Sequence, residues 1–219
     1  MRSYSMALCV AALVACTSLR GASKLRPTLA SADSLALSGI ADSLEALQRQ
    51  FGFGEPAARP EPERSIILAA WTEAEARVAR VTAHAPESVV REWLFGDVYH
   101  AGSRLDVGGA WALAEQHLKR SLALDSTFLP PRLALARLYV NSGLALAPDA
   151  ERLLRGAVVR PDSPDETTVH EGIAVALWYQ GRCRETVKEV ALVLQRTPDN
   201  TLMRFLREGT KERCGAGGA

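Results

Sequence analysis

The sequence lacks an excess of positive charge, since its 26 lysine and arginine residues are balanced by 25 aspartate and glutamate residues. Binding to nucleic acid usually needs a marked basic surplus, so no nucleic-acid partner is expected. Aromatic residues are also scarce, at 6%, whereas alanine, leucine, arginine and glutamate are abundant. This composition favours helix over strand, and the chain is long enough to bury a core. We therefore expect an all-α fold.

Recognisable catalytic motifs are missing as well. The histidines share no metal-ligand spacing: His84, His100, His117 and His170. His170 and Glu171 begin like the zinc-protease motif H-E-x-x-H, but Ala174 stands where the second histidine would be. The phosphate-binding P-loop, the dinucleotide motif G-x-G-x-x-G and the hydrolase motif G-x-S-x-G do not occur. We therefore expect no enzyme, no metal and no cofactor.

A short apolar run near the N-terminus has the features of an export signal. It extends over residues 6–16, comes after Arg2, and is followed by polar sequence from Thr17. A helix of this length rises only about 16 Å, which is too short for the roughly 30 Å hydrocarbon core of a membrane. A signal peptide has an apolar region of this length behind a positive charge.

The end of this run, Leu13-Val14-Ala15-Cys16, resembles the lipobox read by the bacterial lipoprotein signal peptidase. The resemblance implies cleavage before Cys16, a diacylglycerol on its sulfur, acylation of the new amine, and thus a membrane anchor. Thr17 is not the aspartate that retains enteric lipoproteins at the inner membrane, so the implied location is the outer membrane, facing the periplasm. A plain secretory signal, an uncleaved anchor and a wrongly assigned start codon are the alternatives.

The remaining sequence divides by its apolar periodicity and by its prolines. We expect a signal peptide at 1–15, a lipidated tether at 16–30, an amphipathic helix and Pro-rich linker at 31–62, a helix that packs on the repeats at 63–86, repeats at 87–198, a capping helix at 199–214 and a flexible tail at 215–219. The core-facing stripe expected within 63–86 consists of Ile67, Trp71, Ala74, Val78 and Val81.

Residues 87–198 contain three segments of similar pattern, each with a helix, a glycine turn, a second helix and a break. Small residues lie where the two helices of each segment are expected to cross. The first helices carry Gly96, Ala136 and Ala174, and the second helices carry Ala114, Ala150 and Thr186. Larger side chains there would separate the two backbones. The turns are expected near Gly102 to Gly109, at Gly143 and at Gly181.

This pattern resembles the tetratricopeptide repeat (TPR), with its signature W-x₂-L-G-x₂-Y, A-x₃-F and P. The first segment keeps Gly96-x₂-Tyr99 and Ala114-x₃-Leu118, and only the third segment has the family spacing throughout. The resemblance implies a short right-handed α-solenoid of about three helical hairpins and a capping helix, preceded by one or two N-terminal helices. It also implies a concave groove, lined mainly by the first helix of each hairpin.

Counting helical turns outward from the crossing positions predicts which side chains face this groove. They are Trp93, Asp97, His100, Arg137, Asn141, Glu171 and Trp178. Two tryptophans among charged side chains suit a protein segment better than a polyanion. Core packing of Trp93 and Trp178 is the alternative.

Two cysteines are left once Cys9 is removed with the signal peptide and Cys16 carries lipid. Exported proteins fold in an oxidising compartment, so we expect a disulfide between Cys183 and Cys214. Cys183 opens a helix expected at 182–196, and Cys214 follows one expected at 200–213, so an antiparallel pair would bring them together. Closing this loop would stabilise the fold by roughly 3–4 kcal/mol. Two independent thiols are the alternative.

Taken together, these features predict a lipid-anchored periplasmic adaptor that binds an envelope protein or peptide segment. An alternative is an accessory lipoprotein of an uptake system that binds a small molecule or a glycan, with Trp93 and Trp178 stacking on the ligand. The sequence does not identify the partner or the envelope process.

Overall fold

A computed structural model of the chain describes residue 40 and residues 60–83 and 87–215. Within these ranges every regular element is helical and no strand is present, so the expectation of an all-α chain is confirmed there. The chain divides into two compact units, with the boundary between Leu135 and Ala136. This boundary falls inside helix α6, Leu129–Asn141.

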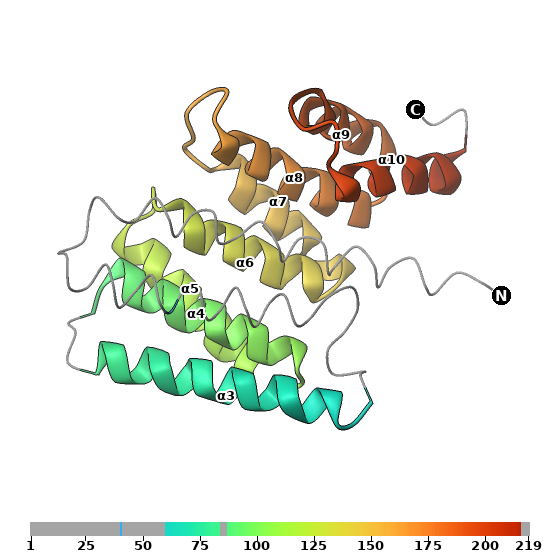
Figure 1. Cartoon of the computed structure of the whole chain (residues 1–219). Helices are drawn as coiled ribbons and strands as arrows, with labels where there is room; N and C mark the ends of the chain where they lie inside the picture. Colours follow the sequence, from blue (N-terminus) through green and yellow to red (C-terminus); the bar gives the residue numbers. More distant parts are fainter. Residues whose placement is uncertain (1–39, 41–59, 84–86, 216–219) are drawn as a thin grey trace. The chain divides into compact units, whose positions relative to one another are not determined.

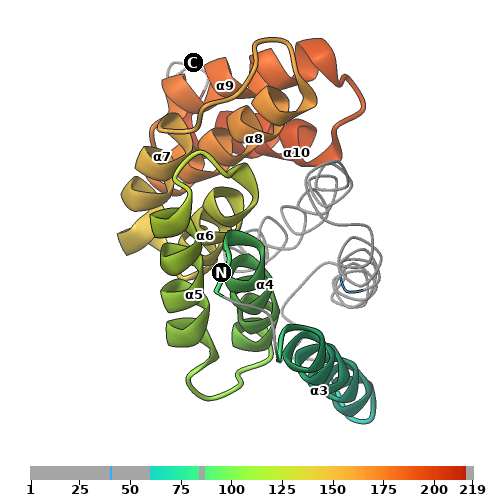
Figure 2. The same ribbon diagram turned by 90° about the vertical axis from the view of Figure 1, so that its left-hand side faces the viewer.

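Unit 1 contains three further described helices, labelled in Figure 1. They are α3 (Glu63–Thr82), α4 (Val89–Arg104) and α5 (Ala110–Leu124). Helix α4 packs against both α3 and α5, so it forms the centre of the unit. Figure 2 shows α4 and α5 side by side as a hairpin.

Unit 2 contains the short 3-10 helix η3 and four α-helices. Their bounds are η3 (Leu144–Leu146), α7 (Ala147–Arg155), α8 (Pro164–Tyr179), α9 (Cys183–Arg196) and α10 (Thr201–Cys214). Helix α8 packs between α7 and α9, and α10 packs mainly against α9. A helix thus lies within the range 199–214 where a capping helix was expected, and its role as a cap of the repeats stays a prediction.

Helix α3 is held on α4 by the apolar stripe predicted for it, with one correction. Ile67, Trp71, Ala74 and Val78 are buried, but Val81 is 39% exposed and the neighbouring Thr82 is buried in its place. Thr82 is four residues after Val78 and therefore continues the stripe, and its hydroxyl donates to the Val78 carbonyl at 2.7 Å. A polar side chain can occupy this buried position because a carbonyl of the helix backbone accepts the hydrogen bond of its hydroxyl.

The small residues predicted at the helix crossings are buried. Exposure is 2% or less at Ala114, Ala136, Ala150, Ala174 and Thr186. At Gly96 in α4, an added Cβ atom would lie 2.5 Å from the Cγ atom of Leu118 in α5. A second close approach, at Gly172 in α8, was not predicted, and it brings the backbone against the Leu154 side chain of α7. Close packing of neighbouring helices therefore depends on small residues in both units.

The glycine turns are shorter than expected in the first hairpin. Helix α4 continues to Arg104, so Gly102 lies inside the helix and packs against the Trp71 ring, leaving only 105–109 as the turn. Gly109 and Gly181 have φ angles of 76° and 72°, in the left-handed region that favours glycine. Gly143 opens the turn that leads into η3.

Helix α8 begins with an N-cap, and a serine followed three residues later by a glutamate, as Ser163 and Glu166 are, is a local sequence signature of a helix start. Ser163 Oγ accepts a hydrogen bond from the Glu166 N–H at 3.2 Å. In a capping box the Glu166 side chain would accept a hydrogen bond from the N–H of the N-cap residue, Ser163. Here it accepts instead from the N–H of the preceding residue, Asp162, at 2.7 Å. Arg196 of α9 also donates to Glu166, so the cap connects the start of α8 with the end of α9.

Several expectations fall on residues outside the described ranges. They include the signal peptide, lipidation of Cys16, the tether, most of segment 31–62 and residues 216–219. Ile40 of the expected first helix is described, is helical and is 1% exposed. None of the helices in the described ranges is both long and apolar enough to cross a membrane.

The crossing at Gly96 gives a stability prediction. Gly96→Ala would gain about 1 kcal/mol of helix propensity but would place its Cβ against a branch point of Leu118, so we expect a net loss of about 1–2 kcal/mol. Gly172→Ala should lose less, because it meets a Leu154 methyl group that can rotate away. The control is Gly108→Ala, which meets no atom within 4 Å. Urea denaturation measures all three, and a Gly96→Ala protein as stable as the control would contradict the prediction.

Candidate functional site

Three of the predicted groove residues lie on α4 in unit 1, and all three are buried. Trp93, Asp97 and His100 are 2%, 1% and 6% exposed. Trp93 meets the ring of Phe128 edge-on, with centroids 6.0 Å apart and an interplanar angle of 87°. This burial matches the alternative in which Trp93 packs in the core.

The other four predicted groove residues lie in unit 2. Arg137 and Asn141 are on α6, where Arg137 is 6% exposed and Asn141 is half-buried. On α8, Glu171 and Trp178 are each 9% exposed. Glu171 accepts a hydrogen bond from Asn200 Nδ2 at 2.5 Å, which ties α8 to the start of α10. The assignment of all seven residues to one groove stays a prediction.

Two glutamate–histidine pairs, which the sequence reasoning missed, connect the helices of the hairpins. In α4–α5, His117 Nδ1 lies 2.7 Å from the buried carboxylate of Glu92. In α8–α9, His170 Nδ1 lies 2.6 Å from the carboxylate of Glu189. A buried carboxylate needs such a partner, because its desolvation is otherwise costly.

The two pairs occupy equivalent positions with their residues exchanged. Glu92 and His170 each stand four residues before the crossing residue of the first helix, Gly96 or Ala174. His117 and Glu189 each stand three residues after the crossing residue of the second helix, Ala114 or Thr186. Aligning the first and third segments on their small residues could have found the pairs. Comparison of the histidines for metal-ligand spacing alone conceals this relation.

In the first hairpin the pair is flanked by aromatic rings. The His117 ring lies nearly parallel to those of Phe95 and Tyr99, with centroids 5.1 and 5.7 Å away. The Arg91 guanidinium lies over the Phe95 ring, 5.7 Å from its centroid. Burial and the nearby Glu75 carboxylate raise the pKa of Tyr99 above its ordinary value. These rings are all half-buried, so the cluster reaches the surface of unit 1.

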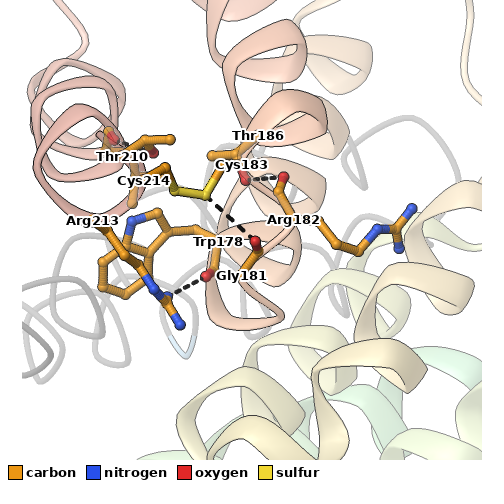
Figure 3. The surroundings of a disulfide bond; sticks show 9 residues. Trp178, Gly181, Arg182, Cys183, Thr186, Thr210, Arg213 and Cys214 are labelled. Atoms are coloured by element: carbon orange, nitrogen blue, oxygen red, sulfur yellow. Dashed lines mark hydrogen bonds between the residues drawn. A yellow bond between two sulfur atoms is a disulfide. The ribbon is translucent and has the colours of Figure 1, made fainter. Parts of the chain in front are cut away.

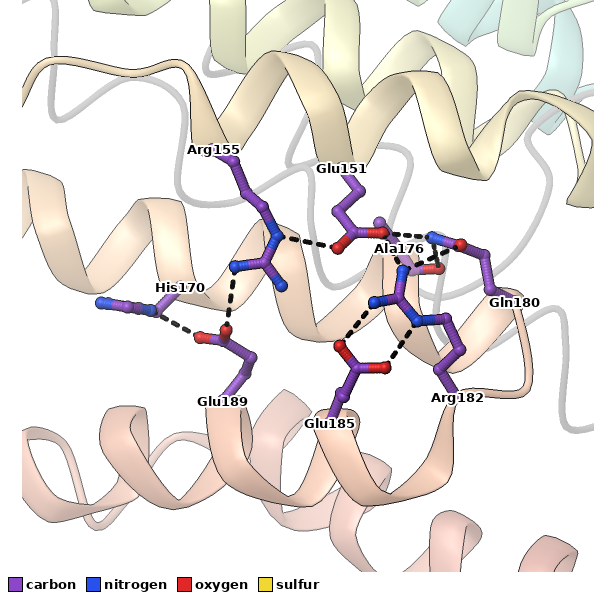
Figure 4. A network of polar contacts seen from close by, with 8 residues as sticks. All are labelled: Glu151, Arg155, His170, Ala176, Gln180, Arg182, Glu185 and Glu189. Carbon is purple, nitrogen blue, oxygen red and sulfur yellow. Dashed lines mark hydrogen bonds and ion pairs between the residues drawn. The ribbon is translucent and has the colours of Figure 1, made fainter.

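In the second hairpin the pair belongs to a larger polar network, shown in Figure 4. Glu151 of α7 accepts hydrogen bonds from Gln180 at 2.9 Å, from Arg155 at 2.8 Å and from Arg182 at 2.5 Å. Arg155 also lies 3.6 Å from Glu189, the partner of His170. The network therefore joins α7 to α8 and α9 through charged groups.

Glu151 is the acceptor at the centre of this network. Burial by itself would raise the pKa of its carboxyl, but the hydrogen bonds from Gln180 and Arg155 and the charge of Arg182 outweigh burial and hold the pKa below its ordinary value of 4.5. The charged form is thus favoured in the folded chain.

The predicted disulfide is present at the end of unit 2 (Figure 3). It joins Cys183, the first residue of α9, to Cys214, the last residue of α10, with Cα atoms 6.5 Å apart. Beside it, Arg213 donates to the main-chain oxygen of Trp178 at 2.7 Å, and its guanidinium carbon lies 5.4 Å from the centroid of the Trp178 ring. The Trp178 Nε1–H has no hydrogen-bond partner among the described residues, which costs about 1–3 kcal/mol.

Residues 60–83 and 87–215 contain no group of three or more side chains placed to hold a metal ion. The chain matches no family model, no curated protein sequence and no solved structure.

Exchanging the two residues of the first pair tests their coupling. Glu92→His alone places two imidazoles face to face, and His117→Glu alone places two carboxylates together, so each should lower the free energy of unfolding by about 1–3 kcal/mol. The double variant restores an acid–imidazole pair and should recover most of the summed loss in a double-mutant cycle. Exchange of the exposed pair Glu115 and Lys119 is the control and should change little. Additive losses in the buried pair would rule out coupling.

The lowered pKa of Glu151 predicts how stability depends on pH. Since its folded-state pKa lies below 4.5, its contribution is complete above that pH and is lost as the pH falls through the depressed value. Glu151→Gln should be less stable at neutral pH and should lose less stability on acidification. Urea denaturation between about pH 7 and about pH 3 measures this. The control is Glu212→Gln, at an exposed site without an ion pair in the described chain, which should keep the wild-type dependence of stability on pH. If wild type, Glu151→Gln and Glu212→Gln all lost stability in parallel on acidification, the lowered pKa of Glu151 would be contradicted.

Proposed function

We propose that this chain is a lipid-anchored scaffold of the bacterial cell envelope, in which a TPR-like array of helical hairpins binds a segment of another envelope protein. The observation that carries this proposal is the repeated hairpin crossing. Each proposed repeat places a small, buried residue on its first helix and another on its second helix. Such crossings are what the TPR resemblance requires, and TPR-like arrays act by presenting a binding surface.

The buried polar side chains of α4 support an array with a defined geometry. Asp97, His100 and Arg104 follow one another along one face of the helix and are 1%, 6% and 6% exposed. Each of the three has an interaction partner. Buried and partnered ionisable groups fix which helix faces are apposed, so they would give the proposed array one defined geometry rather than contact a bound segment directly.

The burial of the two tryptophans also favours the adaptor over the glycan-binding alternative. Stacking on a sugar needs an open ring face, but Trp93 and Trp178 are only 2% and 9% exposed. Trp93 already contacts Phe128, and the Trp178 ring carries the Arg213 guanidinium.

The export part of the proposal rests on the N-terminal sequence and on the disulfide. The lipobox resemblance gives Cys16 the role of anchor and gives the chain an outer-membrane location. The Cys183–Cys214 bond supports folding in an oxidising compartment such as the periplasm. In this proposal residues 16–62 hold the helical units away from the bilayer.

Site-specific crosslinking in envelope membranes tests the adaptor function. A photo-crosslinking residue at the half-buried Asn141 should give a covalent adduct with one discrete envelope protein. The same residue at Lys119, whose side chain is 57% exposed on α5, is the control and should not give that adduct. No protein adduct from Asn141, together with binding of a glycan that Trp178→Phe abolishes, would reject the adaptor in favour of the alternative.

The anchor is tested by labelling cells with a radioactive fatty acid. Cys16→Ala should lose the label and leave the membrane fraction, because the residue that accepts the lipid is gone. Cys9→Ala is the matched control and should keep both properties, since Cys9 is removed with the signal peptide. A Cys16→Ala protein that stays labelled and membrane-bound would contradict the proposed anchor.

A further inference from the structure

The two halves of α10 are fixed to unit 2 in different ways. Its first half inserts Leu202, Met203 and Leu206 into the core, with exposures of 6%, 0% and 0%. Its second half buries only Gly209 and Thr210, and the Thr210 hydroxyl bonds back to Leu206 of the same helix at 2.6 Å. Apolar burial thus secures the beginning of α10 far better than its end.

The end of α10 is held by two contacts, which lie next to each other in Figure 3. One is the Cys183–Cys214 disulfide, and the other is the contact of Arg213 with the carbonyl and ring of Trp178. Arg213 has no carboxylate partner among the described residues. Loss of the covalent bond would therefore leave one exposed arginine to hold the last turns of the helix.

These last turns cover a side chain with an unused binding capacity. Trp178 is 9% exposed, and its Nε1–H finds no acceptor in the described part of the chain. Arg213, the residue before Cys214, lies across its ring. Movement of the end of α10 would expose an indole donor and an aromatic face, and would release the guanidinium beside them.

We propose that the Cys183–Cys214 disulfide is a redox-operated latch that controls access to Trp178. A dithiol reductant attacks one sulfur through a thiolate, forms a mixed disulfide, and is then oxidised to its own disulfide. Two electrons and two protons are transferred, so Cys183 and Cys214 become thiols. The second half of α10 then frays from α8 and α9, while Leu202, Met203 and Leu206 keep its first half in place.

What the opened surface binds follows from its donors. The indole N–H and the guanidinium both require an acceptor, so the surface fits a carbonyl or carboxylate oxygen of a peptide segment. This part of the inference rests on the proposed adaptor function, whereas opening of the latch does not depend on it.

Hydrogen–deuterium exchange of the purified chain, with and without a dithiol such as dithiothreitol, tests the latch. Amides of residues 207–214 should exchange about tenfold faster or more in the reduced protein, whereas those of α3, α4 and α5 should be unchanged. The Cys183→Ser, Cys214→Ser double variant should behave like the reduced protein whether or not dithiol is present. Equal protection of 207–214 in both redox states would overturn the latch, as would equally accelerated exchange throughout α8 and α9.

Acrylamide quenching of tryptophan fluorescence reports directly on Trp178. The difference between wild type and Trp178→Phe isolates its signal from the other three tryptophans, and its quenching should rise severalfold on reduction. An unchanged difference signal would overturn the proposal. The Asn141 crosslink, measured in both redox states, distinguishes failure of the latch from failure of the adaptor function. If the adduct forms but hydrogen–deuterium exchange is the same in both states, the latch alone is rejected. If exchange is faster in the reduced protein but no adduct forms in either state, the adaptor function alone is rejected.

Discussion

Close approach of two helix backbones is the constraint on which the rest of the structure depends. At Gly96 the backbone of α4 comes so near to α5 that a methyl group would collide with Leu118. This proximity also brings Glu92 within hydrogen-bond distance of His117. The α8–α9 hairpin is built in the same way. Its small residues Ala174 and Thr186 are buried, and His170 lies within hydrogen-bond distance of Glu189. The small residues therefore determine more than packing, because they place the glutamate–histidine pairs at contact distance.

Because charged groups lie between closely packed helices, their partners have to be specific. Glu151 can remain charged only because Gln180, Arg155 and Arg182 supply donors to both of its oxygens. Replacing such groups with apolar ones of similar shape could give equal or greater stability, so stability alone does not explain them. The pairs instead define which helix faces are apposed, and the array proposed above would need that definition to present its surface in one geometry.

Much of the fold was predictable, because helical periodicity, caps and glycine turns are local properties of the sequence. The helices, the Ser163 cap and the Cys183–Cys214 bond follow from such signals. The burial of Thr82 in place of Val81, and the inclusion of Gly102 in α4, were missed because they depend on what the neighbouring helix presents. The candidate site was less predictable. A helical-turn count selects a direction around one helix, but it does not show whether another segment covers the side chain, as Phe128 covers Trp93.

The position of the disulfide in the chain has a consequence for the order of folding. Cys214 comes after every described helix has been synthesised, 31 residues later than Cys183. In the proposed export the chain would cross the membrane N-terminus first, so α9 would reach the oxidising compartment before its covalent partner in α10 does. Until Cys214 follows, α8 and α9 would be held only by their own hydrogen bonds and packing. These hydrogen bonds include Ser163 with Glu166 and His170 with Glu189. The bond would thus close on a hairpin that is already held by its own contacts.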